Sequence, residues 1–248
     1  MHNTTLENLK DELLKNNTIS SDYYSEFDVK RGLRNKDGSG VLAGLTHISS
    51  VIGSKKSDNG LLPVEGILKY RGVSLADIVD GCDESKTHHF ERTCFLLLVG
   101  RLPTPSEEKS FSDYMAQHRE IPVNIVENII KAIPSQDIMN KLQTAISALY
   151  AYDDNPDSLD PTENFFKSIR LIAKLPSIVA LSYLTTYNPT AKIVVPTSQM
   201  SQAEAFLHIL SSGKNTSSFD TFIISITFLF AAPCKGPFRL ATAAANEE

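Results

Sequence analysis

Four cysteine and histidine side chains lie within a short stretch of the chain: Cys82, His88, His89 and Cys94. Thiolates and imidazoles are the usual ligands of zinc in proteins. The four residues lack the paired C-x-x-C spacing of structural zinc sites, and Cys94 falls inside an apolar helical stripe. The sequence therefore favours a core cysteine and exposed histidines over a metal site.

Three further histidines form no catalytic arrangement, and neither do two short polar segments that contain aspartate. His47 lies in an apolar run, which favours a core or strand-edge side chain over a catalytic base. His118 and His208 fall in predicted helices without an acidic partner at a suitable spacing. Residues 37–40 indicate a turn and not a phosphate loop, because they lack the lysine and the strand-to-helix context; residues 153–154 indicate a solvated loop. From the residues alone we assign no catalytic, substrate-binding, cofactor-binding or metal-binding residue.

The composition is that of a globular protein. Hydrophobic residues make up 42% of the 248 residues, which suffices for a sizeable core. The net charge of −5 comes without a basic block, which argues against nucleic acid as a partner. Three cysteines without metal spacing suit a reducing compartment. The start of the chain lacks a signal peptide, and the longest apolar run, residues 222–232, is shorter than the roughly 20 residues that span a bilayer. We expect a soluble, cytoplasmic protein with no membrane partner.

One β-hairpin is predicted near the start of the chain. Residues 41–52 are rich in β-branched residues and leucine, and residues 66–72 form a second candidate strand. The polar residues 55–60 predict the loop between them.

Helices are predicted elsewhere, because apolar residues recur at three- and four-residue steps. Capping boxes open two of them, at Thr4 with Glu7 and at Ser201 with Glu204. Pro176 is expected to kink or split a long helix. The expected helices are residues 4–17, 21–27, 74–79 (capped by Ser74, closed by Gly81), 90–99, 105–118 (capped by Thr104), 123–133, 135–149 (capped by Ser135), 162 onward, and 201–210 (ended by Gly213).

Several segments together resemble the citrate synthase family, of the shorter bacterial kind. The segments are Gly32–Asn35, Gly44–Ser50, Gly66–Gly72, Phe90–Glu91, Leu96–Thr104, Thr144–Leu149, Ile169–Pro176 and Ala203–Leu210. Their order and spacing carry the resemblance, which covers about the first half of a full-length family member.

The resemblance implies a mainly α-helical large domain with a small amino-terminal β-hairpin. It divides the chain into an amino-terminal helical extension (1–30), a partial citrate-synthase-like helical domain (31–220) and a divergent tail (221–248). It also implies a homodimer that joins acetyl-CoA to oxaloacetate, with water, to give citrate and CoA; acetyl-CoA is then a substrate, and no cofactor is implied. Such chemistry needs a carboxylate to take a proton from the thioester methyl group, a neutral donor for the enolate, a histidine for the ketone, and arginines for the dicarboxylate.

The last part of the chain departs from the family pattern. Residues 223–230 replace the family's His-rich oxaloacetate segment and contain no histidine. Lys235–Pro237 and Ala245–Glu247 resemble the two ends of a family string whose catalytic histidine is missing between them. Arg239 stands near its place, but a permanent cation cannot act as a neutral donor. The second histidine, the catalytic aspartate, the CoA-binding loop and the clamping arginines have no counterparts before Glu248, which suggests a deletion or a reading-frame error.

Four arginines remain as substitutes for the missing groups, and all fall in segments that the family uses for framework and dimer contacts: Arg31, Arg34, Arg71 and Arg170. We expect them to act in packing.

Three functional interpretations follow. The first is a truncated, inactive citrate synthase; the second is a non-catalytic dimerisation or binding module that pairs with an intact synthase; the third is a 2-methylcitrate synthase. Without the family's remaining half, an apolar patch is expected to be exposed and to lower solubility: Phe222, Ile223, Ile224, Phe228, Leu229 and Phe230.

Overall fold

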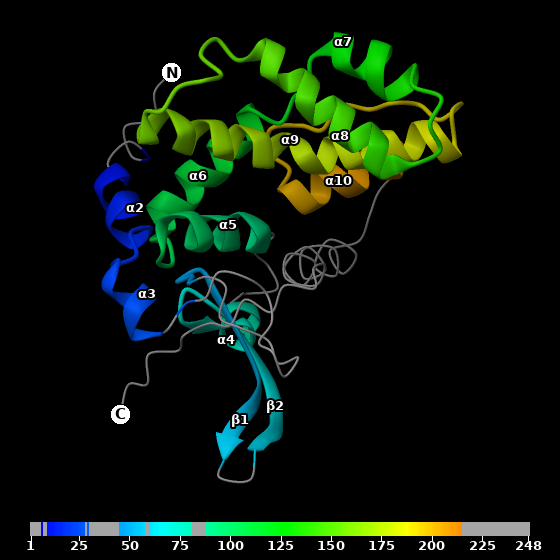
Figure 1. Ribbon diagram of the computed structural model, residues 1–248. Coiled ribbons are helices and arrows are strands. Elements are labelled where there is room, and N and C mark those ends of the chain that lie inside the picture. Colours follow the sequence, from blue (N-terminus) through cyan, green and yellow to red (C-terminus); the bar gives the residue numbers. More distant parts are fainter. Residues whose placement is uncertain are drawn as a thin grey trace. The chain divides into compact units, whose positions relative to one another are not determined.

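The computed structural model describes residue 6, residues 9–27, residue 29 and residues 45–57, 60–80 and 88–214 (Figure 1). These residues are mainly helical and contain one small antiparallel sheet, which confirms the predicted fold class. Several predictions lie outside the described residues: the capping box at Thr4 and Glu7, the segments with Arg31 and Arg34, the turn at 37–40, Gly81, Cys82, and the tail with its apolar run, Lys235–Pro237 and Arg239.

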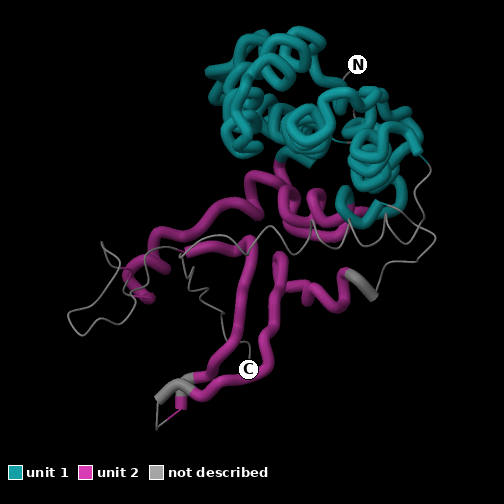
Figure 2. Tube along the Cα trace, turned by 90° about the vertical axis from the view of Figure 1, so that its right-hand side faces the viewer, with its two compact units in different colours: residues 1–10, 84–91, 104–229 teal, residues 11–83, 92–103, 230–248 magenta. Residues whose placement is uncertain are grey.

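The chain divides into two compact units, which Figure 2 shows in different colours. Unit 1 comprises residues 1–10, 84–91 and 104–229, and unit 2 comprises residues 11–83, 92–103 and 230–248. The helix α5 (His89–Val99) crosses this division, so its first turn belongs to unit 1 and its remainder to unit 2. Each unit is therefore treated separately below.

Unit 2 contains the sheet, whose strands follow the order β1-β2-β3. The strands are β1 (Ser49–Ser57), β2 (Gly60–Tyr70) and β3 (Val73–Ser74). The predicted hairpin is confirmed, but β1 starts only at Ser49 and the predicted polar loop at residues 55–60 is wrong. Lys55 and Lys56 pair with Leu62 and Leu61 and so extend the ladder almost to the turn. The ladder consists of backbone hydrogen bonds, and lysines are well suited to an edge strand such as β1.

Short helices complete unit 2. They are α2 (Lys10–Asn16), α3 (Asp22–Glu26) and α4 (Leu75–Asp80), with the larger part of α5. The Ser74 hydroxyl accepts the backbone N–H of Asp77 at 3.0 Å, as predicted for the cap of α4. The end of α2 at Asn16 agrees with the predicted stop.

Arg71 connects three backbone segments of unit 2. Its Nη1 donates to the carbonyl of Asn16 at 2.8 Å, and its Nη2 donates to Asn17 Oδ1 at 2.6 Å and to the carbonyl of Leu97 at 2.9 Å. Arg71 also has a φ of 49°, a left-handed conformation that non-glycine residues adopt rarely. These contacts support the framework role predicted for Arg71.

Gly100 ends α5 in a conformation that favours glycine. Its φ is +95°, and a Cβ placed there would lie 2.9 Å from the side chain of Asn16, whose Nδ2 donates to the carbonyl of Val99 at 2.7 Å. We expect Gly100→Ala to lower the free energy of unfolding by about 1–3 kcal/mol, because the backbone would be strained and Asn16 displaced. Urea denaturation followed by far-ultraviolet circular dichroism measures this change. Gly66→Ala is the matched control, since nothing lies within 4 Å of its added Cβ; equal losses in the two variants would contradict the prediction.

Unit 1 is a packed set of helices. They are α6 (Pro105–Gln117), α7 (Val123–Ile125), the π-helix η1 (Val126–Lys131), α8 (Ile138–Leu149), the 3-10 helix η2 (Tyr150–Tyr152), α9 (Pro161–Tyr187) and α10 (Gln202–Leu210). The longest of these, α9, packs against α6, η1, α8 and α10 (Figure 1). Their shared core contains Ile121, Ile125, Ile130, Ala145, Ile178, Ala180, Leu181 and Ile209.

Local signals predict the helix starts of unit 1 with mixed success. The predicted capping box at Ser201 with Glu204 is present, and the predicted cap at Thr104 also forms a capping box, with Glu107. The predicted cap at Ser135 is wrong, because Asp137 accepts the N–H of Met139 at 2.8 Å and begins α8. Asp160 likewise caps α9 ahead of the predicted start at residue 162.

Two helices also differ from prediction in their interiors. The helix expected over residues 123–133 changes from α to π geometry after Ile125. The long helix α9 is continuous through Pro176, so the expected split is wrong, whereas the expected kink stays a prediction. Pro176 is buried, and both Ala173 and Ile178 beside it are fully buried, so the packing of α9 outweighs the missing backbone hydrogen bond.

By length and composition, α9 is also apolar enough to cross a membrane, with a mean hydropathy of 1.2 over its most apolar stretch. Half of that stretch is buried inside the fold, as in the core helix of a globular unit, so this is weak evidence for a membrane span.

Candidate functional site

The sequence analysis favoured a core cysteine and exposed histidines over a metal site, and this prediction is partly confirmed. Cys94 is buried in α5, as predicted for a core cysteine. The histidines were expected to be exposed, which is wrong for His89, since only 5% of its surface is accessible; His88 is half-buried. Among the described residues, no group of three or more His, Cys, Asp or Glu side chains is arranged to hold a metal ion, and Cys82 lies outside them.

The other histidines occupy unremarkable positions. His47 is exposed two residues before β1 and its ring approaches Tyr23 edge-on, which agrees with the strand-edge alternative and not with the core. His118 ends α6, and its Nδ1 lies 2.8 Å from the carbonyl of Tyr114. Burial lowers the pKa of His118, which favours the neutral form of its imidazole. His208 is half-buried near the end of α10.

A buried polar cluster in unit 1 was missed by the sequence analysis. Glu91 is 2% exposed, Arg119 4% and Gln202 0%. The Glu91 carboxylate accepts the backbone N–H of Gln202 at 2.7 Å, and Arg119 Nε donates to Gln202 Oε1 at 3.0 Å. Arg119 also donates to the carbonyls of Met200 and Thr197. The cluster thus joins the first turn of α5, the end of α6 and the start of α10.

Some of the buried polar atoms in this cluster have no hydrogen-bond partner. Within the described part of the chain, Glu91 Oε2 and Gln202 Nε2 are buried without a hydrogen-bond partner. His88 Nδ1 lies 3.7 Å from Glu91 Oε1, which is within ion-pair range but beyond a hydrogen bond. The Glu91 carboxylate raises the pKa of His88 against the opposing effect of burial. For Arg119, burial lowers the guanidinium pKa, while Glu91 and Glu204 oppose that change.

A second polar region of unit 1 is an open pocket beside α9. Its volume is about 450 Å³. Three cations from α9 line it, Lys167, Arg170 and Lys174, which share one helix face at three- and four-residue steps. The other lining residues are Glu120, Ile121, Pro122, Leu149, Tyr152, Asp153 and Leu171.

Two of these three cations are held by neighbouring groups. Lys167 Nζ forms an ion pair with Asp153 at 3.3 Å and donates to the carbonyl of Asn155. Lys174 Nζ donates to the carbonyls of His118 and Glu120, and burial lowers its pKa. Arg170 Nε donates to the carbonyl of Phe166 at 3.3 Å, and its charge contributes to lowering the pKa of Asp153. Among the described residues, no hydrogen bond engages its terminal nitrogens. Arg170 can therefore receive a carboxylate or a phosphate in this pocket.

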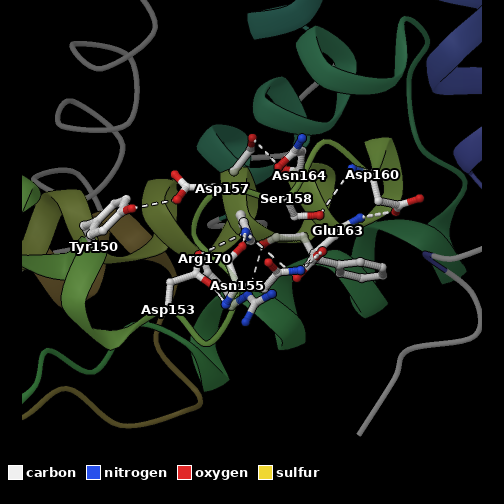
Figure 3. A network of polar contacts seen from close by, with 12 residues as sticks. Tyr150, Asp153, Asn155, Asp157, Ser158, Asp160, Glu163, Asn164 and Arg170 are labelled. Carbon is white, nitrogen blue, oxygen red and sulfur yellow. Dashed lines mark hydrogen bonds and ion pairs between the residues drawn. The ribbon is translucent and has the colours of Figure 1, made fainter.

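The residues of the loop before α9 form a network of polar contacts with one another and with the start of that helix (Figure 3). Tyr150 Oη donates to Asp157 at 2.9 Å, and Asn155 Nδ2 donates to Glu163 at 3.0 Å. The N–H of Asn155 lowers the pKa of Asp153, and Lys167 lowers it further. The solvated loop expected at residues 153–154 is therefore found at Asp154, which is exposed, whereas Asp153 is held by Lys167 and by the Asn155 N–H.

The fold and these sites were compared with known proteins. A family model described as "Citrate synthase, C-terminal domain" matches residues 36–231. The chain belongs to the citrate synthase family. The 2-methylcitrate synthase of Mycobacterium tuberculosis is 31% identical over 182 residues, and the citrate synthase of Haloferax volcanii is 29% identical over 189 residues.

Solved citrate synthases agree with this assignment. The Pyrobaculum aerophilum enzyme superposes with a TM-score of 0.60 at 25% identity, covering 79% of this chain and 50% of that one. The Thermotoga maritima citrate synthase gives a TM-score of 0.56 at 21% identity, which shows the fold alone. The matched residues make up 73% of this chain but 40% of the Mycobacterium relative, so the match spans less than half the length of that relative.

The family expected from the resemblance is therefore confirmed. Of the segments that carry it, Gly32–Asn35 and the first residue of Gly44–Ser50 lie outside the described residues. The rest of Gly44–Ser50 leads into β1, and the remaining segments lie on or beside β2, α5, α8, α9 and α10. The absence of any assigned catalytic, substrate-binding or cofactor-binding residue stays a prediction, as does the framework role of Arg170.

Proposed function

We propose that this chain is a citrate-synthase-type protein whose described part supplies scaffold and not proton-transfer groups. The substrates that this proposal favours are an acyl-CoA and oxaloacetate, which such an enzyme condenses. The relatives bear the names citrate synthase and 2-methylcitrate synthase, which supports this choice. A homodimer in the cytoplasm is part of the proposal.

The scaffold role is supported by the bonding partners of the polar groups in unit 1. Glu91 is buried and accepts a backbone N–H of α10, and Asp153 is paired with Lys167. A catalytic base must instead reach the substrate proton. Both carboxylates are thus engaged in structural contacts, which supports a scaffold role.

We expect the purified chain to release no thiol above background from acetyl-CoA with oxaloacetate, or from propionyl-CoA with oxaloacetate. A chromogenic thiol reagent measures the release, with an intact citrate synthase as the positive control. Turnover by the chain alone would overturn the scaffold proposal, and the ratio of the two rates would then assign citrate or 2-methylcitrate synthesis.

A non-catalytic module that pairs with an intact synthase is the second candidate. It is favoured by large exposed side chains on α8 and α9, namely Met139, Tyr183 and Tyr187, which are 68%, 47% and 61% exposed. Mixing the chain with an intact synthase and measuring mass by light scattering tests it. A mixed species supports the module, and two unchanged components exclude it.

A further inference from the structure

The amino-terminal end of α10 rests on a buried carboxylate that has few partners. Glu91 Oε1 accepts the Gln202 N–H at 2.7 Å, which satisfies one of the free backbone donors of the helix start. Its Oε2 is buried without a hydrogen-bond partner among the described residues. A buried carboxylate is stable only when nearby positive charge compensates the loss of water. The strength of this contact therefore depends on the cations around it.

Arg119 is the constant cation of the cluster. Its nitrogens are committed to Gln202 Oε1 and to the carbonyls of Met200 and Thr197, so it acts on Glu91 through space and not by a direct hydrogen bond. An arginine keeps its charge throughout the physiological pH range.

His88 is the variable cation. Its side chain is 38% exposed, whereas that of Glu91 is 2% exposed, so the imidazole reaches solvent while its partner does not. The other charged groups that act on His88 are Glu204 of α10 and Glu108 of α6, and both favour the imidazolium. Gain or loss of this proton changes the charge beside Glu91 without changing its other contacts.

We propose that His88 and Glu91 form a proton-operated latch on the start of α10. With His88 protonated, the imidazolium stabilises the Glu91 carboxylate and the carboxylate holds the Gln202 N–H. With His88 neutral, that part of the stabilisation is absent and the first turn of α10 opens more often. The pKa of His88 is raised in the folded chain, so the stabilisation is full below the unfolded pKa of about 6.5 and is lost as the pH rises through the folded pKa.

Amide hydrogen exchange at Gln202, Ala203 and Glu204, corrected for intrinsic rates, tests the latch independently of any enzymatic activity. We expect the opening constant of these amides to rise about two- to fivefold from slightly acidic to slightly alkaline pH, the range typical of a partly exposed ion pair. His88→Gln should abolish this pH dependence. His47→Gln, at an exposed histidine outside the cluster, should retain it.

A proton NMR titration of the His88 ring provides the second measurement. In Glu91→Gln the pKa of His88 should fall, because the neighbouring negative charge is gone. If Glu91→Gln does not fold, the latch is still tested by comparing the pH dependence of amide exchange in His88→Gln with that in the parent chain. The latch is overturned if His88→Gln keeps the pH dependence of the parent, or if the folded Glu91→Gln chain leaves the His88 titration unchanged.

Discussion

Arg119→Met is expected to lower the free energy of unfolding by about 3–5 kcal/mol, the usual effect of removing one member of a buried charge network. Methionine keeps much of the apolar volume, so the change is mainly the loss of charge and donors. Gln202 Oε1 and the carbonyls of Met200 and Thr197 would lose their donor, and Glu91 would lose its constant cation. Buried acceptors left without donors are costly, which places Arg119 among the most sensitive positions of unit 1.

Urea denaturation followed by far-ultraviolet circular dichroism measures this effect. Lys109→Met is the control, since Lys109 pairs with Asp113 at 2.7 Å on an exposed face of α6 and should change stability by no more than about 0.5 kcal/mol. Similar losses in the two variants would show that the buried network contributes no more than a surface ion pair.

Ile178→Ala is expected to lower the free energy of unfolding by about 2–5 kcal/mol. Ile178 is fully buried in α9, in the core that also contains Ile130, Ala145 and Ile209. Removing its outer carbons leaves a cavity where α8, η1 and α10 meet α9, because a close-packed core relaxes only in part.

The matched control is Leu171→Ala, on the same helix but 38% exposed. We expect its effect to be about 1 kcal/mol or less, since less apolar surface is removed from contact. Thermal unfolding of the two variants beside the parent chain is the measurement. Equal shifts would show that Ile178 is not part of a tightly packed core.

Features within a few residues of one another were predictable. The cap at Thr104 and the capping box at Ser201 follow from contacts between residues three apart, which the order of residues sets directly. The helix end at Gly100 follows from a backbone conformation that glycine adopts without strain. The family was likewise predictable, because its segments are short strings in a set order.

Features that depend on contacts between residues far apart in the sequence were not predictable. Lys55 and Lys56 look like loop residues, but they lie in a strand because the backbone of β2 is alongside them. Pro176 looks like a helix breaker, but burial on α9 outweighs its missing hydrogen bond. Glu91 and Gln202 are 111 residues apart and Arg119 and Gln202 are 83 apart, and no local spacing brings such groups together. Local sequence thus sets those element ends that depend on neighbouring residues, such as the caps at Thr104 and Ser201. The buried polar cluster exists only through tertiary packing, because side chains lose water and become dependent on one another only when the helices meet.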